Sequence, residues 1–156
     1  MTYCLIMGSS RGLGAAMVEE FLKREDMFII GFARSDIKEI KNSEQWLATK
    51  RYRHIKTDIT QSECTEKLKT ICSELSGKPL MIIFNAALVK SDSSENKRII
   101  YPIFDEINRI AIGGLRRVLE GVEDHLLNFG GVFVGISAFS AIAPPVQELR
   151  LAYPAT

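Results

Sequence analysis

The sequence predicts an α/β domain built on a doubly wound parallel sheet, and two observations support this fold class. Short runs rich in β-branched and aromatic residues recur along the chain, and they are almost continuously apolar, as in strands buried on both faces. Segments with helical periodicity separate these runs, so strands and helices alternate. The expected strands are residues 3–7, 28–32, 52–55, 80–84 and 132–136.

The alternation βαβαβαβαβ predicts a helix between each pair of successive strands, and particular residues mark three of these helices. The first follows the first strand and contains Ala15, Val18 and Leu22. Two further segments repeat apolar residues at helical spacing: Cys64, Leu68, Ile71, Cys72 and Leu75 in one, and Ile103, Ile107, Ile110, Val118 and Val122 in a longer one. The chain has 156 residues with no internal repeat and no linker, so residues 1–156 are expected to form a single domain.

Charge and composition exclude several classes of function. The formal net charge is +1, so no overall field attracts nucleic acid or an anionic membrane. The N-terminal segment MTYCLIMGSS has no basic region before its apolar run, so neither a signal peptide nor a membrane span is expected. Three cysteines without metal-ligand spacing predict reduced, buried thiols, no metal site and a cytoplasmic protein, with a cysteine nucleophile as the alternative. A basic cluster is interpreted as a solvated approach to the third strand: Lys50, Arg51, Arg53, His54 and Lys56.

A glycine-rich turn, GSSRGLG, follows the first expected strand and precedes the first expected helix. Glycines in such a place permit a tight turn, let backbone N–H groups approach a pyrophosphate, and allow the helix to pack closely on the strand. The turn therefore predicts dinucleotide binding in a Rossmann-type fold, with a purely structural turn as the alternative. The expected binding residues are Gly8, Ser10, Arg11, Gly12, Leu13 and Gly14.

The spacing GxxxGxG resembles the short-chain dehydrogenase/reductase family, and further segments occur in the order found in that family. Asp58 in the segment DIT corresponds to the acidic residue that hydrogen-bonds the adenine, and the resemblance implies that Asp58 and the following Ile59 contact the cofactor. Asn108 corresponds to the helix asparagine that organises a proton relay. Taken singly, Asp58 could instead cap the following helix and Asn108 could lie on a wet helix face.

The segment FNAA corresponds to the NNAG motif of the family. Asn85 and Ala86 match this motif, and the resemblance implies that they contact the cofactor. Phe84 and Ala87 depart from it, because they stand where the family has asparagine and glycine. The alternative role for Asn85 is to satisfy backbone groups of its own loop.

The residues after the second strand favour NADP(H) over NAD(H). An enzyme that selects NAD places a carboxylate at this point, whereas one that selects NADP offers cations to the 2′-phosphate. Here Phe32 and Ala33 are followed by Arg34, and Arg11 in the glycine turn supplies a second guanidinium. Binding of NAD(H) stays open, since Asp36 would oppose the phosphate if the strand ended later.

The resemblance also implies the catalytic residues. The family uses a serine at the end of the fifth strand, a tyrosine as acid/base, and a lysine four residues after that tyrosine. Tyr153 in AYPAT corresponds to the tyrosine, so the chain is expected to be truncated just before the lysine, with five strands present and the C-terminal part of the fold missing. Ser137 is the preferred catalytic serine because it ends the fifth strand, and Ser140 is the alternative because its interval to Tyr153 is more usual.

The resemblance implies an NADP(H)-dependent oxidoreductase that transfers hydride between nicotinamide and a carbonyl or alcohol substrate. One alternative is a truncated or degenerate member that binds a dinucleotide or a partner without catalysis, and another is a methyltransferase or a different doubly wound domain. A homodimer or homotetramer is implied through the long helix, where Gly113 and Gly114 would allow close approach. An uncovered sheet edge further predicts self-association.

Overall fold

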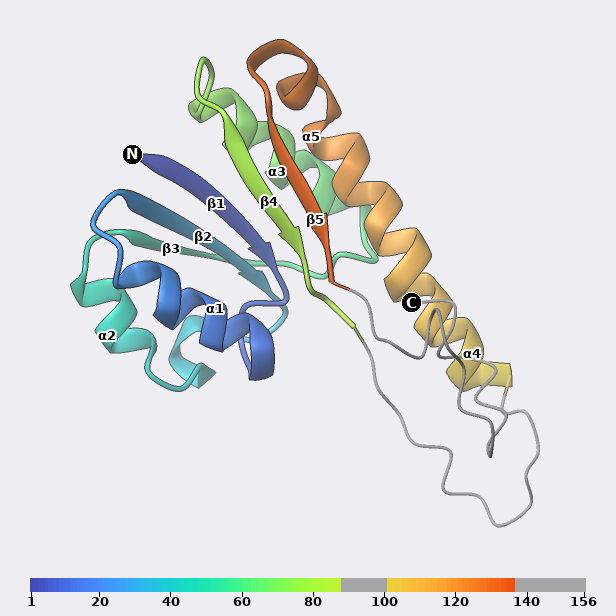
Figure 1. Cartoon of the computed structure of the whole chain (residues 1–156). Helices are drawn as coiled ribbons and strands as arrows, with labels where there is room; N and C mark the ends of the chain where they lie inside the picture. Colours follow the sequence, from blue (N-terminus) through green and yellow to red (C-terminus); the bar gives the residue numbers. More distant parts are fainter. Residues whose placement is uncertain (88–100, 137–156) are drawn as a thin grey trace, which may run out of the picture.

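A five-stranded parallel sheet forms the centre of the protein, in a computed structural model that describes residues 1–87 and 101–136. Its order is β3-β2-β1-β4-β5 (Figure 1). The strands are β1 (Thr2–Met7), β2 (Met27–Ala33), β3 (Tyr52–Lys56), β4 (Leu80–Phe84) and β5 (Gly131–Gly135). The expected parallel sheet and its five strands are confirmed, and every strand begins and ends within one residue of its expected position.

Helices cover both faces of this sheet (Figure 1). In chain order the helical elements are α1 (Gly12–Leu22), the short 3₁₀ helix η1 (Ile37–Glu39), α2 (Ser43–Ala48), α3 (Ser62–Glu74), α4 (Tyr101–Asn108), the π-helical segment η2 (Arg109–Gly114) and α5 (Leu115–Phe129). The helices α1 and α2 lie on one face, and α3 and α5 lie on the other. The long helix expected from periodicity is present as α4, η2 and α5 in direct succession.

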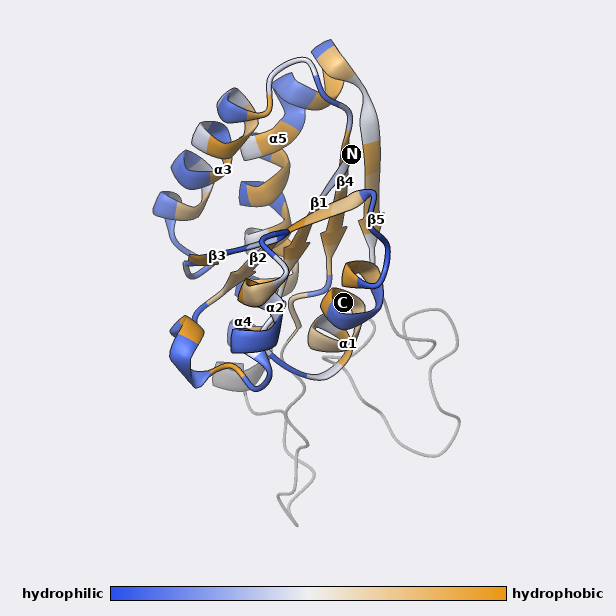
Figure 2. Cartoon of the chain, turned by 90° about the vertical axis from the view of Figure 1, so that its left-hand side faces the viewer, coloured by the Kyte–Doolittle hydropathy of each residue, from blue (hydrophilic) through white to orange (hydrophobic). Residues whose placement is uncertain are grey.

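Two hydrophobic cores lie on opposite sides of the sheet, because successive side chains of a strand point to opposite faces. In β1, Leu5 and Met7 belong to the core under α3 and α5, whereas Cys4 and Ile6 belong to the core under α1 and α2. The apolar strands and the hydrophilic outer side of α3 are visible in Figure 2. Both faces of the central strands are therefore buried, as their continuous apolar runs predict.

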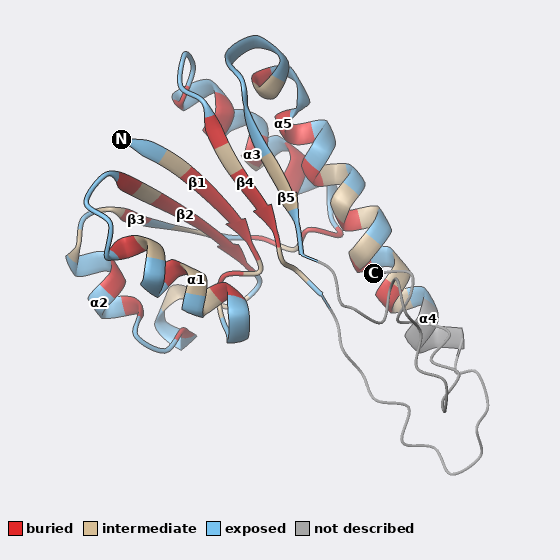
Figure 3. Ribbon diagram, in the orientation of Figure 1, coloured by how far each residue is buried: buried red, intermediate tan, exposed pale blue. Residues whose placement is uncertain are grey.

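The strand β5 differs from the other strands in its exposure. It lies at one edge of the sheet, and Figure 3 shows it largely exposed where β1 and β4 are buried. Val132 is 56% exposed although it is a β-branched apolar residue in a strand. Among the described strands β5 pairs with β4 alone, so its other edge offers backbone groups that no described strand pairs with.

The three cysteines are free and buried, as expected. Burial raises the pKa of Cys4 to about 12 and that of Cys64 and Cys72 to about 11. Thiols with such pKa values stay protonated at neutral pH, which argues against the cysteine nucleophile. Within the described ranges, no helix combines the length and apolar character needed to span a membrane.

The prediction that the basic cluster is simply solvated was wrong for two of its members. The guanidinium of Arg51 donates to the carbonyls of Leu22 (2.8 Å) and Met27 (3.3 Å), so it satisfies backbone acceptors at the last residue of α1 and the first residue of β2. His54 is half-buried and hydrogen-bonds the loop after β2. Periodicity reveals neither contact, because both depend on the pairing of β2 with β3.

Candidate dinucleotide-binding site

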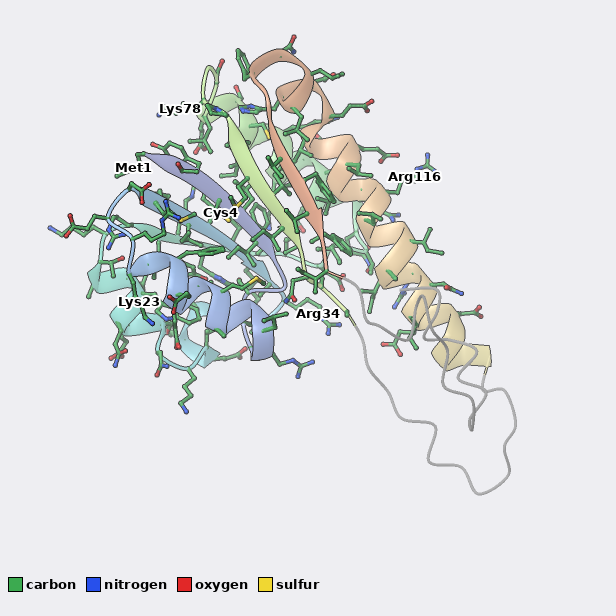
Figure 4. All side chains as sticks on the ribbon, viewed as in Figure 1. Met1, Cys4, Lys23, Arg34, Lys78 and Arg116 are labelled. Atoms are coloured by element: carbon green, nitrogen blue, oxygen red, sulfur yellow. The ribbon has the colours of Figure 1, made fainter. Side chains whose placement is uncertain are left out.

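The candidate site lies at the edge of the sheet where the parallel strands end. The loops after β1, β2, β3 and β4 meet there. The order of the strands reverses at β1, because β2 and β3 lie on one side of it and β4 and β5 on the other. Open α/β sheets bind ligands at such a switch point. Arg34 marks this edge in Figure 4, at the end toward which the strand arrows point.

The glycine turn packs directly against the end of β4. Gly8 has φ +86°, and a Cβ there would lie 2.9 Å from the Cα atom of Ala86. A Cβ on Gly14 would overlap the carbonyl oxygen of Gly8. Asn85 joins the two loops, because its Nδ2 donates to this same Gly8 oxygen at 3.2 Å. Asn85 therefore satisfies a backbone group of the glycine turn, and not one of its own loop, and it fixes the turn at the same time.

The first turn of α1 presents backbone N–H groups at the site. Arg11 is the N-cap residue in an extended conformation, and among the described residues no side chain caps the helix. Arg11, Gly12 and Leu13 are exposed, while Gly14 is buried against the turn. An uncapped helix start offers N–H donors and a positive dipole end to an anion.

In the loop after β2, the side chain of Arg34 is exposed, whereas the carboxylate of Asp36 binds other groups. Because β2 ends at Ala33, Arg34 is the first residue of the loop, and its side chain is exposed. The Asp36 carboxylate accepts from the Lys38 amide (3.3 Å) and lies 3.6 Å from the Lys56 ammonium. The Lys38 amide first, and then the charge of Lys56, lower the pKa of Asp36 despite some desolvation. Asp36 is thus engaged within its own loop.

Asp58 follows β3, and the structure contradicts its alternative role as a helix cap. Its Oδ1 accepts from the backbone N–H and the hydroxyl of Thr60, both at 2.8 Å, while Gln61 is the N-cap residue of α3. Desolvation raises the pKa of Asp58, but the two Thr60 bonds and the charges of Arg34 and Arg109 outweigh it and lower the pKa. The carboxylate is therefore ionised at neutral pH, and Oδ2 has no hydrogen-bond partner among the described residues.

Asn108 ends α4 immediately before η2. Its side-chain Oδ1 is buried and has no hydrogen-bond partner within residues 1–87 and 101–136. Single π-helical turns are often found at functional sites. Gly114 ends η2, and a Cβ there would lie 2.7 Å from Cδ1 of Ile59. The close approach expected at Gly114 is therefore made to Ile59 of the same chain.

A hollow of about 150 Å³ lies beside the turn, at the ends of β4 and β5. It is lined by Phe84, Ala86, Ala87, Ala111, Leu115, Phe133, Gly135 and Ile136. Ser10, also predicted, is half-buried in the glycine turn, whereas the predicted catalytic residues Ser137, Ser140 and Tyr153 lie outside the described residues. Sequence reasoning missed Arg109, whose charge acts on Asp58 and whose only signal was its place next to Asn108.

Comparisons with known proteins agree with this geometry at the level of the fold. No family model and no curated protein matches the sequence. Among solved structures, 99% of the chain matches a short-chain dehydrogenase/reductase from Saccharomyces cerevisiae with a TM-score of 0.79 and 18% identity. A short-chain type dehydrogenase/reductase from Mycobacterium marinum gives 0.80 over 99% of the chain at 16% identity, and the enzyme ElxO with NADP bound gives 0.78 over 92% at 21% identity.

The chain thus has the Rossmann-type fold found in short-chain dehydrogenase/reductase structures, as the glycine turn predicts. It spans 60% of the yeast protein, 63% of the mycobacterial protein and 58% of ElxO.

Proposed function

We propose that this chain supplies the nucleotide-binding part of an NADP(H)-dependent oxidoreductase of the short-chain type, which transfers hydride between nicotinamide and a carbonyl or alcohol. One observation carries the proposal. The glycine turn packs on Asn85 and Ala86 and leaves the start of α1 uncapped, at the edge that also holds Arg34 and Asp58. ElxO, a structure of similar fold, has NADP bound.

Each part of the edge fits one part of the nucleotide. The uncapped N–H groups of α1 suit the pyrophosphate, and the ionised Asp58 suits the adenine amino group. Arg34, with Arg11, suits the 2′-phosphate through charge-assisted hydrogen bonds. When bound, the nicotinamide supplies or accepts the hydride.

The catalytic roles follow the resemblance. Tyr153 gives a proton to the substrate oxygen, and Ser137, or alternatively Ser140, hydrogen-bonds that oxygen. Asn108 organises a water-mediated proton relay, in which its buried Oδ1, without a partner among the described residues, would accept a hydrogen bond from a water. The free buried thiols are typical of a reducing compartment, so we place the protein in the cytoplasm.

The second candidate is a protein that binds the dinucleotide without turnover. Phe84 favours it, because this ring is buried in the core where the motif of the family has a polar residue. Oxidation of NADPH in the presence of aldehydes and ketones, by a protein that joins this part to the lysine of the family motif, separates the two functions, since only the oxidoreductase consumes the cofactor.

The test of the proposal is a fluorescence titration of the chain with NADPH and with NADH. We expect NADPH to bind at least about tenfold more tightly, because charge-assisted bonds to its 2′-phosphate add about 1.5–3 kcal/mol. Equal affinity for the two nucleotides contradicts the cofactor preference. Binding of neither nucleotide contradicts the proposed function.

We also expect the chain to self-associate, as a homodimer or homotetramer. A groove of about 600 Å³ follows η2 and α5, lined by Ile112, Leu115, Arg116, Leu119, Glu120, Glu123, Leu126 and Leu127. Ile112 and Leu127 are 58% and 77% exposed, and β5 is an edge strand that pairs only with β4 among the described strands. Burial of such apolar surface drives association. A monomer in sedimentation at high concentration would refute this expectation.

A further inference from the structure

Polar side chains connect the glycine turn with the loop after β2, on the α1 side of the sheet. Ser9 is fully buried and Tyr52 is 5% exposed. They meet over Gly31, where a Cβ would overlap the Tyr52 hydroxyl and lie 2.5 Å from Oγ of Ser9. Glycine at residue 31 therefore leaves the space in which these two hydroxyl groups lie together.

The next member is His54, which pairs with Gly31 across β2 and β3. Its Nε2 lies 3.0 Å from the carbonyl oxygen of Ser35, and its Nδ1 lies 3.5 Å from the Tyr52 hydroxyl. A carbonyl oxygen only accepts hydrogen bonds, so Nε2 must carry the hydrogen. In the neutral ring Nδ1 is then the acceptor, and the hydrogen bonds run from Tyr52 through His54 to Ser35.

The protonation states support this direction. Burial lowers the pKa of His54, and Lys56 lowers it further, against the opposing effects of the Ser35 carbonyl and the Asp36 carboxylate. The ring is therefore neutral at neutral pH, and Nδ1 is free to accept. Burial also raises the pKa of Tyr52 against a hydrogen bond with Ser9, so its hydroxyl keeps the proton that it donates.

Ser35 directly follows Arg34, which makes this backbone contact relevant to the cofactor. The last ladder bond of β2 joins the Ala33 carbonyl to the Thr57 amide at 2.8 Å, and η1 is capped from Asp36 onward. Between these points the imidazole of His54 holds the Ser35 carbonyl. Side chains fixed by a supporting hydrogen bond orient the groups that touch a ligand.

We propose that His54 is a positioning residue that orients the Arg34 loop toward the 2′-phosphate of NADP(H). The proposal rests on the proposed function and deepens it, because it assigns part of the cofactor preference to a residue that does not touch the cofactor. His54 belongs to the basic cluster of the sequence, but it acts through hydrogen bonds of a neutral ring.

The test compares NADPH and NADH affinity in His54→Phe and His54→Gln. Phenylalanine keeps an aromatic ring, although a larger one, and removes both hydrogen bonds, so we expect NADPH affinity to fall about tenfold while NADH affinity stays within about twofold. Glutamine carries its amide nitrogen near the place of Nε2, so it should restore most of the NADPH affinity. The control is Arg53→Ala, which changes the neighbouring residue of β3. It removes an exposed ion pair with Glu74 of α3 and should change neither affinity.

The outcomes separate this proposal from the proposed function. A wild-type chain that binds neither nucleotide overturns both. A wild-type chain that prefers NADPH, with the same preference in His54→Phe or an equal loss of both nucleotides, overturns the role of His54 alone. If His54→Phe does not fold, the smaller His54→Leu takes its place. It also removes the hydrogen bond to the Ser35 carbonyl, so an unchanged NADPH preference there overturns the proposal.

Discussion

Replacing Gly14 by alanine is expected to abolish NADPH binding and to lower the free energy of unfolding by about 2–3 kcal/mol, the upper range for overpacking. The added Cβ would overlap the carbonyl oxygen of Gly8 and lie 2.8 Å from Nδ2 of Asn85. The first of these atoms belongs to the backbone and cannot rotate away. Relief requires α1 to move from the turn, which displaces the N–H groups proposed to hold the pyrophosphate.

Gly113→Ala is the matched control for this substitution. Its Cβ would lie 3.5 Å from a terminal nitrogen of the flexible Arg117 side chain, which is an ordinary contact. Urea denaturation and NADPH titration of both variants measure the two effects. Unchanged stability and NADPH affinity in Gly14→Ala would show that the turn is looser than its packing indicates.

Reversal of the charge at Arg34 is expected to reverse the cofactor preference. Arg34→Asp removes charge-assisted bonds and brings a carboxylate toward the 2′-phosphate, so NADPH affinity should fall about 100-fold, equivalent to about 2.7 kcal/mol. NADH affinity should stay constant or rise, because a carboxylate after the second strand accepts a hydrogen bond from the ribose 2′-hydroxyl. The ratio of the two dissociation constants is the quantity to measure.

Arg116→Asp provides the charge-matched control. Arg116 is an exposed cation on α5, far from the strand ends, and pairs with Glu120 (Figure 4). The same charge change there should alter the nucleotide affinities little, because exposed charges are screened over about 8–10 Å. A similar loss of NADPH affinity in both variants would mean that overall charge, and not a site at Arg34, governs binding.

The fold was predictable because its strands are buried on both faces. The continuous apolar runs located all five strands, and helical periodicity located α3 and the long helix. The sequence did not locate the two short helices between Ile37 and Ala48, because η1 and α2 are too short to show a helical period, although Ile40 and Trp46 are buried. The π-helical turns of η2 keep the same apolar side inward, so periodicity did not reveal them.

The grouping of the candidate site residues was predictable wherever the end of a strand could be located in the sequence. Parallel strands deliver the residues that follow them to one edge, which is why Gly8, Arg34, Asp58 and Asn85 could be grouped from their order in the chain. The role of His54 was not predictable in this way, because it depends on register. His54 faces Gly31 across β2 and β3, and only that pairing brings its ring to the loop after Arg34.

The most direct test of the site is the amide NMR spectrum of the ¹⁵N-labelled chain during titration with 2′,5′-ADP, which carries the adenosine and the 2′-phosphate of NADP. We predict shifts in the glycine turn, at Arg34 and Ser35, and at Asp58, with 5′-AMP leaving the Arg34 loop unchanged. Shifts confined to other surfaces, or identical shifts of the Arg34 loop with both nucleotides, would contradict an NADP(H) site at this edge of the sheet.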